Sequence, residues 1–67
     1  MKIKGNSILI TGGASGIGRL LGLISIRKGA SAVIVWDINP VSIAKVKQEF
    51  EQEAKGSTQI FSAVVDV

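Results

Sequence analysis

The most constraining feature of this chain is a glycine-rich segment, Thr11 to Gly18, that follows the apolar run Ile8-Leu9-Ile10. The apolar run predicts a buried strand, and Leu20 to Ile26 predicts a helix. At such a junction the first backbone N–H groups of the helix point into the turn, where the helix dipole adds partial positive charge. Because glycine also lets a ligand approach the backbone closely, the segment predicts a phosphate-binding turn, best suited to a dinucleotide.

The spacing of the glycines narrows this prediction. Thr11 precedes Gly12, Gly16 and Gly18, which form a Gly-x3-Gly-x-Gly pattern. The general dinucleotide fingerprint is Gly-x-Gly-x-x-Gly, and a P-loop would continue into Gly-Lys-Ser/Thr, which this sequence lacks. Thr-Gly-x3-Gly-Ile-Gly resembles the cofactor motif of the short-chain dehydrogenase/reductase family in its compact form. The resemblance covers nearly the whole chain.

The remaining pattern predicts alternating strands and helices. Gly29 is a plausible C-terminal residue of the first helix, and Asn39-Pro40 supplies an N-cap and a first position for the second. We expect strands over 6–11, 32–36 and 59–65 and helices over 16–28 and 39–56. This β-α-β-α-β order, with right-handed crossovers, places both helices on one side of a parallel sheet.

Helical periodicity also predicts which faces are buried. In the second helix Ile43, Val46, Phe50 and Ala54 share one face. Gly22 interrupts the first helix, and a small residue there suggests close packing on the preceding strand. In the first helix the expected buried face is Ile17, Leu20, Leu21 and Ile24.

The sequences of the three strands predict how the whole domain is built. The first two are apolar without alternation and the third nearly so, which is typical of strands buried on both faces. The 67 residues hold nothing to cover the second face. We therefore expect the α/β fold to be a Rossmann-type doubly wound parallel sheet, with residues 1–67 as the N-terminal part of a single NAD(P)-binding domain. An intact compact family member would have roughly 250 residues in one domain.

Composition excludes several other classes. There is no cysteine and no histidine, so neither a disulfide nor a thiolate metal site is expected. The net charge of +3 comes from scattered lysines and arginines with few aromatic residues, which argues against nucleic-acid binding. No apolar run approaches the ~20 residues of a membrane span, and the N-terminus lacks a signal peptide pattern. The expected location is the cytoplasm.

An acidic residue after the second strand bears on the choice of cofactor. Asp37 lies about twenty residues beyond the glycine turn, where a carboxylate accepts hydrogen bonds from the adenosine ribose. The alternative role is that of a solvated turn residue, or of a cap for the helix that starts at Asn39-Pro40. A carboxylate there repels a 2′-phosphate, which favours NAD(H) over NADP(H). NADP-preferring family members often carry a cation where this chain has Ser15 and Ile38, and Arg19 is expected to be an exposed residue of the first helical turn.

The resemblance implies further site residues. Asp66 and Val67 match the family's Asp-Val after the third strand, where the carboxylate accepts from the adenine amino group; the alternative for Asp66 is a polar strand end. Ile38 would form an apolar wall for adenine. Trp36 lies within an apolar strand, so core packing is expected rather than stacking on a ligand. The implied cofactor-binding set is Gly12, Ser15, Gly16, Ile17, Gly18, Asp37, Ile38, Asp66 and Val67.

The resemblance implies an activity whose catalytic groups this chain does not contain. The family uses a Tyr-x-x-x-Lys pair with a serine and an asparagine, and this chain has no tyrosine. The expected function is the cofactor-binding half of an NAD(H)-dependent oxidoreductase that transfers hydride between nicotinamide and an alcohol or carbonyl substrate. By resemblance the protein would form a homodimer or homotetramer. Two alternatives stay open: a non-catalytic NAD(H) sensor on the same fold, and an S-adenosylmethionine methyltransferase, whose glycine spacing is usually tighter.

Overall fold

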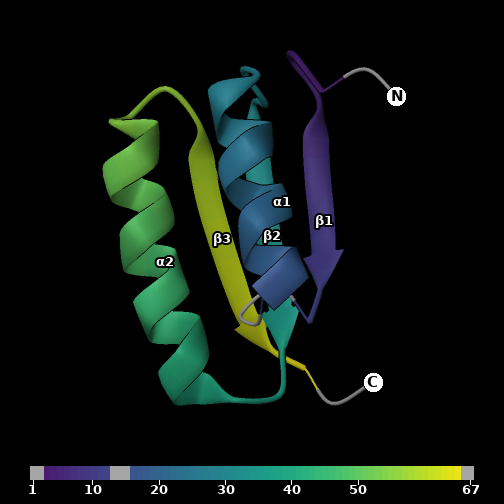
Figure 1. The fold of residues 1–67 in the computed structure, drawn as a ribbon, viewed down its shortest axis with the longest axis vertical. Helices are drawn as coiled ribbons and strands as arrows, with labels where there is room; N and C mark the ends of the chain where they lie inside the picture. The colour runs from purple at the N-terminus through teal and green to yellow at the C-terminus, as the bar shows by residue number, and fades with distance from the viewer. Residues whose placement is uncertain (1–2, 13–15, 66–67) are drawn as a thin grey trace.

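The computed structural model describes residues 3–12 and 16–65, which fold into one layer of strands and one layer of helices (Figure 1). The element order confirms the predicted alternation of strands and helices. The elements are β1 (Ser7–Thr11), α1 (Gly16–Arg27), β2 (Ala32–Asp37), α2 (Pro40–Ala54) and β3 (Gln59–Val64).

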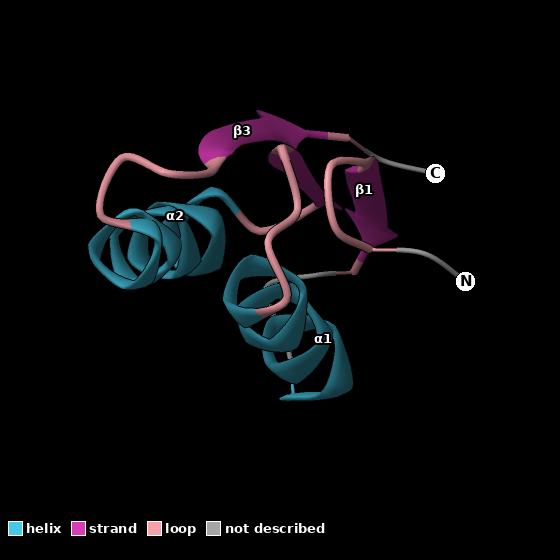
Figure 2. Cartoon of the chain, turned by 90° about the horizontal axis from the view of Figure 1, so that it is seen from above, coloured by secondary structure: helices cyan, strands magenta, loops and turns pink. Residues whose placement is uncertain are grey.

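The sheet is parallel, with β2 between β1 and β3. Leu9 lies opposite Ile34, which lies opposite Phe61, so one row of side chains runs across the three strands. Both helices cover the same face of the sheet, as right-handed crossovers require (Figure 2). The arrangement confirms the predicted Rossmann-type half.

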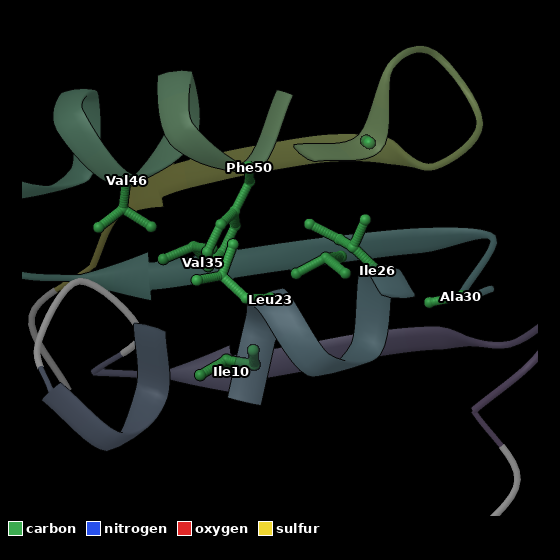
Figure 3. Packing of buried hydrophobic residues seen from close by; sticks show 9 residues of the cluster. Ile10, Leu23, Ile26, Ala30, Val35, Val46 and Phe50 are labelled. Atoms are coloured by element: carbon green, nitrogen blue, oxygen red, sulfur yellow. The ribbon is translucent and has the colours of Figure 1, made fainter. Parts of the chain in front are cut away.

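The core lies between the sheet and the two helices. Val35 of β2 and Phe50 of α2 are fully buried and point toward each other (Figure 3). Val33 of β2 is fully buried as well, and it lies on the same side of the strand as Val35 because side chains alternate. A fully buried apolar side chain of this size contributes about 1.5–3 kcal/mol relative to an exposed one. The cluster consists of Ile10, Leu23, Ile26, Ala30, Val33, Val35, Val46, Phe50 and Ala54.

Helix α2 follows its sequence signals closely. The side chain of Asn39 accepts hydrogen bonds from the backbone of Val41 (3.0 Å) and Ser42 (3.2 Å), as an N-cap does. At its other end Lys55 takes a left-handed conformation (φ 51°) ahead of Gly56. The predicted buried face, Ile43, Val46, Phe50 and Ala54, is confirmed residue for residue.

Helix α1 corrects the prediction of its buried face. Its buried residues are Gly22, Leu23, Ser25 and Ile26, whereas Ile17, Leu20 and Leu21 of the predicted face are exposed. The reason is a close approach between helices: a Cβ at Gly22 would overlap the ring of Phe50, lying 2.5 Å from Cε2. Gly22 therefore lies against Phe50 of α2, on the same side of α1 as the buried Leu23 and Ile26.

The sheet face opposite the helices is apolar and open. Leu9 and Phe61, at the two ends of the row through Ile34, are each 50% exposed. Trp36 lies outside the core cluster and is only partly buried, which corrects the expectation of core packing. Because side chains alternate along a strand and Val33 and Val35 face the helices, Trp36 lies on the open face with Ile34.

Candidate functional site

The candidate site lies at the edge of the sheet where the parallel strands end. The arrowheads of the strands point to this edge, and both helices begin there (Figure 1). Ligands of open α/β sheets bind outside the carboxyl ends of the strands. Three segments meet here: the turn after β1, the loop after β2, and the chain that leaves β3.

The glycine turn begins with a backbone conformation that favours glycine. Gly12 has a φ of +67°, in the left-handed region, directly after β1 ends at Thr11. Its N–H donates to the carbonyl oxygen of Trp36 at 2.7 Å, which ties the turn to the end of β2. Ser15, a predicted phosphate-contacting residue, lies outside the described residues.

The other motif residues form the first turn of α1. Gly16, Ile17 and Gly18 open the helix, where the first N–H groups have no partner within the helix itself. Apart from its chain neighbours and the backbone of its own helix, no described atom lies within 4 Å of a Cβ built at Gly16. The Ile17 side chain is 79% exposed. An open approach to these backbone groups is what a bound phosphate requires.

Asp37 is the last residue of β2, and its side chain binds the backbone of the loop that follows. Its Oδ1 accepts hydrogen bonds from the backbone N–H of Ile38 (2.7 Å) and Asn39 (3.3 Å). These bonds fix the orientation of the carboxylate beside the start of α2. Asp37 therefore acts as a turn residue in this structure. Its binding of the adenosine ribose stays a prediction.

The loop after β2 also holds the chain that leaves β3. The N–H of Val65 donates to the carbonyl oxygen of Asp37 at 2.8 Å. Ile38, predicted to lie against adenine, is 61% exposed at this edge. Asp66 and Val67 lie outside the described residues, directly after Val65. The structure thus brings together Gly12, Gly16, Ile17, Gly18, Asp37 and Ile38 at one edge of the sheet.

An ion pair beside the glycine turn escaped the sequence analysis. Arg19 donates to Glu49 of α2 through Nε (2.6 Å) and Nη2 (2.5 Å), so the arginine is exposed but engaged. The hydrogen bond from Arg19 lowers the pKa of Glu49 below its usual value, and the same bond raises the pKa of Arg19. The residues are thirty positions apart, and no helical or strand spacing could have linked them.

The described residues contain neither a candidate metal site nor a membrane-spanning helix. Residues 3–12 and 16–65 hold no group of three or more acidic, histidine or cysteine side chains that could bind a metal ion. No helix in that part of the chain has the length and hydropathy to cross a membrane.

Comparison with known proteins points to one family. Residues 6–67 match the family model described as short chain dehydrogenase. The chain is 38% identical over 52 residues to the uncharacterized oxidoreductase YhxC of Bacillus subtilis (strain 168), a match that covers 78% of this chain and 18% of that protein.

Solved structures of other proteins superimpose closely on this chain. A short-chain type dehydrogenase/reductase from Mycobacterium ulcerans superimposes with a TM-score of 0.86 at 29% identity, over 98% of this chain and 24% of that one. A structure described as NAD+-bound xylitol dehydrogenase gives 0.85 at 24% identity, over the same shares of the two chains, and supports the fold alone. The chain thus spans about a quarter of the length of these two structures.

Proposed function

The chain belongs to the short-chain dehydrogenase family, and we propose that it is the cofactor-binding part of an NAD(H)-dependent oxidoreductase. In this proposal the complete enzyme transfers hydride between the nicotinamide and an alcohol or carbonyl carbon. Residues 1–67 would bind the adenosine and pyrophosphate portions of the cofactor.

The observation that carries the proposal is the placement of the glycine turn. Gly12 leaves β1 in a left-handed conformation and is tied to β2 through Trp36, and α1 opens with Gly16 and Gly18. Backbone N–H groups and the helix dipole are thereby directed at one point beside the sheet edge. An anionic group such as a pyrophosphate is the ligand that this arrangement stabilises.

Local charge favours NAD(H) over NADP(H). The carboxylate of Asp37 is held at the end of β2 by two backbone N–H groups, where it would repel a 2′-phosphate and accept from ribose hydroxyls. Ile38, the next residue, is apolar. Arg19 is paired with Glu49, so its charge is directed toward α2 rather than toward a cofactor phosphate.

The cofactor supplies the hydride chemistry, and the residues of this chain bind and orient it. Any group that moves the proton of the alcohol would come from outside residues 1–67, in keeping with the family resemblance. The open face marked by Leu9, Ile34 and Phe61 supports the proposal that these residues belong to a larger doubly wound domain. Helices on that face would bury it as in other doubly wound folds.

Direct binding tests the proposed function. The full-length gene product that carries this chain should bind NADH in isothermal titration calorimetry, and bind NADPH at least about tenfold more weakly, since a charge-assisted hydrogen bond is replaced by repulsion. Binding of neither dinucleotide would contradict the proposal. Tighter binding of NADPH would contradict its cofactor preference and leave the family-level function in place.

A further inference from the structure

In the part of the chain that the structure describes, the first turn of α1 has no buried side chain. The buried residues of this helix begin at Gly22, and Ile17, Leu20 and Leu21 are all more than half exposed. Helix ends that lack buried contacts fray readily. Yet under the proposed function this turn must present its backbone N–H groups to a pyrophosphate in a fixed geometry.

One side-chain interaction ties this turn to α2. Arg19 follows Gly18 directly, and its guanidinium meets both carboxylate oxygens of Glu49, at 2.6 Å from Nε and 2.5 Å from Nη2. Such a two-point pair fixes orientation as well as distance. Glu49 in turn precedes Phe50, the fully buried ring against which Gly22 packs. The pair therefore joins the exposed turn to the best-anchored part of α2.

Stability is not the main consequence of such a pair. Both side chains are substantially exposed, 47% for Arg19 and 37% for Glu49, and exposed ion pairs contribute little to unfolding free energy. A contact that adds little to the global unfolding free energy can still decide the position of a helical turn for which the described residues show no buried apolar packing.

We propose that Glu49 is a positioning residue for the cofactor site, which acts by holding the first turn of α1 through Arg19. The inference rests on the proposed function, because it concerns the same dinucleotide. Glu49 touches no cofactor in this account. It keeps the N–H groups after the glycine turn in register with the end of β2.

Direct binding of a cofactor phosphate by Arg19 would predict the opposite effect of removing Glu49. If the guanidinium bound a cofactor phosphate directly, Glu49 would compete for it, and removing Glu49 would strengthen cofactor binding. If the pair positions the turn, removing either partner weakens binding by the same mechanism. The sign of the Glu49 effect therefore separates the two roles.

The chain contains a matched control. Arg27, in the last turn of α1, meets Glu53 of α2 at 3.4 Å through two N–H donors. This pair joins the same helices with the same residue types, at the end remote from the glycine turn. A general weakening of the helix contact would affect both pairs, and loss of positioning would affect only the first.

The test compares Glu49→Gln, Arg19→Gln, their double variant and the control Glu53→Gln in the full-length gene product. We expect Glu49→Gln and Arg19→Gln each to raise the dissociation constant of NADH by about fivefold, the scale of an exposed pair, with no further rise in the double variant. Glu53→Gln should stay within about twofold of wild type. Without cofactor, amide hydrogen exchange over residues 20–22, whose N–H groups donate to the carbonyl oxygens of the first turn, should quicken in the two single variants while the global unfolding free energy stays nearly unchanged.

Each other outcome overturns the inference. Stronger or unchanged NADH binding by Glu49→Gln, or an equal loss in Glu53→Gln, would remove the positioning role. If wild type binds NADH and only these variants fail the prediction, the proposed function stands and the inference alone falls. If wild type binds neither dinucleotide, the proposed function fails and the inference falls with it.

Discussion

At the scale of single residues, Asp37 combines two tasks. Its Oδ1 caps the start of the loop by accepting from Ile38 and Asn39, and its carbonyl oxygen accepts from Val65 after β3. A carboxylate held by backbone donors is pre-oriented, so a ligand that bonds to it loses less free energy to side-chain ordering. The same carboxylate is the main charge that would separate NAD(H) from NADP(H) at this site.

Replacing the carboxylate of Asp37 by an amide tests whether its charge sets the preference between NAD(H) and NADP(H). Asp37→Asn keeps an oxygen for the N–H groups of Ile38 and Asn39 but removes the negative charge. We expect the ratio of the NADPH to the NADH dissociation constant to fall at least about tenfold, because ribose bonding weakens and phosphate repulsion disappears. Titration calorimetry with both dinucleotides gives the ratio.

The control for Asp37→Asn disturbs the loop without touching the charge. Asn39→Ala removes the α2 N-cap and should lower the unfolding free energy by about 1 kcal/mol. It should leave the cofactor ratio unchanged. A ratio that responds to the cap but not to Asp37 would place specificity in the loop conformation instead of the carboxylate.

At the scale of elements, the contact between α1 and α2 sets the position of the first helix. Phe50 is fully buried, and its ring occupies the space that a side chain at Gly22 would need. A side chain as large as leucine at position 22 would keep α1 and α2 further apart. A glycine at this point therefore costs helix propensity and gives a close approach.

The variant Gly22→Ala measures the balance between helix propensity and the close approach of α1 and α2. Alanine would favour the helix by about 1 kcal/mol through its higher propensity, but overlap with the fully buried ring of Phe50 outweighs this, and we expect a net loss of about 1–3 kcal/mol in unfolding free energy. Chemical denaturation of the full-length protein gives the value. Phe50→Leu in the Gly22→Ala background should recover part of the loss, and a gain in stability from Gly22→Ala alone would show that the close approach is not tight.

The two helices also show how far sequence patterns reach. In α2 only one stripe is apolar, and Ile43, Val46, Phe50 and Ala54 were identified correctly. In α1 two stripes are apolar, one through Leu20 and Leu21 and one through Leu23 and Ile26. Periodicity cannot choose between them, because the choice depends on how α2 and the sheet approach, a property of tertiary packing.

The site was predictable to the extent that it is local. The positions of Gly12, Gly16 and Asp37 follow from strand ends and turn residues, and the structure gathers them at one edge. The pairing of Arg19 with Glu49 depends on two helices meeting, so no local spacing contained it. Trp36 was assigned to the core because its strand is apolar throughout, although alternation places it on the open face.

At the scale of the whole molecule, the described residues have a packed face and an open one. The helices cover Val33 and Val35, while the row from Leu9 to Phe61 is partly exposed on the other side. The unalternating strands predicted burial on both faces, and the structure shows one of the two covered. This agrees with the proposal that the chain forms part of a doubly wound domain.

The central claim, that the glycine turn binds the pyrophosphate of a nicotinamide dinucleotide, is tested most directly by Gly16→Ala. Apart from the chain neighbours and the backbone of α1, no described atom lies within 4 Å of the added Cβ, so the folded protein should tolerate alanine, which has the higher helix propensity. The same methyl group would occupy the space that a phosphate needs to reach the backbone.

Stability and affinity should therefore change in opposite directions. In the full-length protein we predict an unchanged or higher melting temperature without cofactor, together with an NADH dissociation constant raised at least about tenfold in titration calorimetry, the effect of one lost charge-assisted hydrogen bond. A folded Gly16→Ala variant that binds NADH as tightly as wild type would contradict the claim and leave the glycine motif a structural turn.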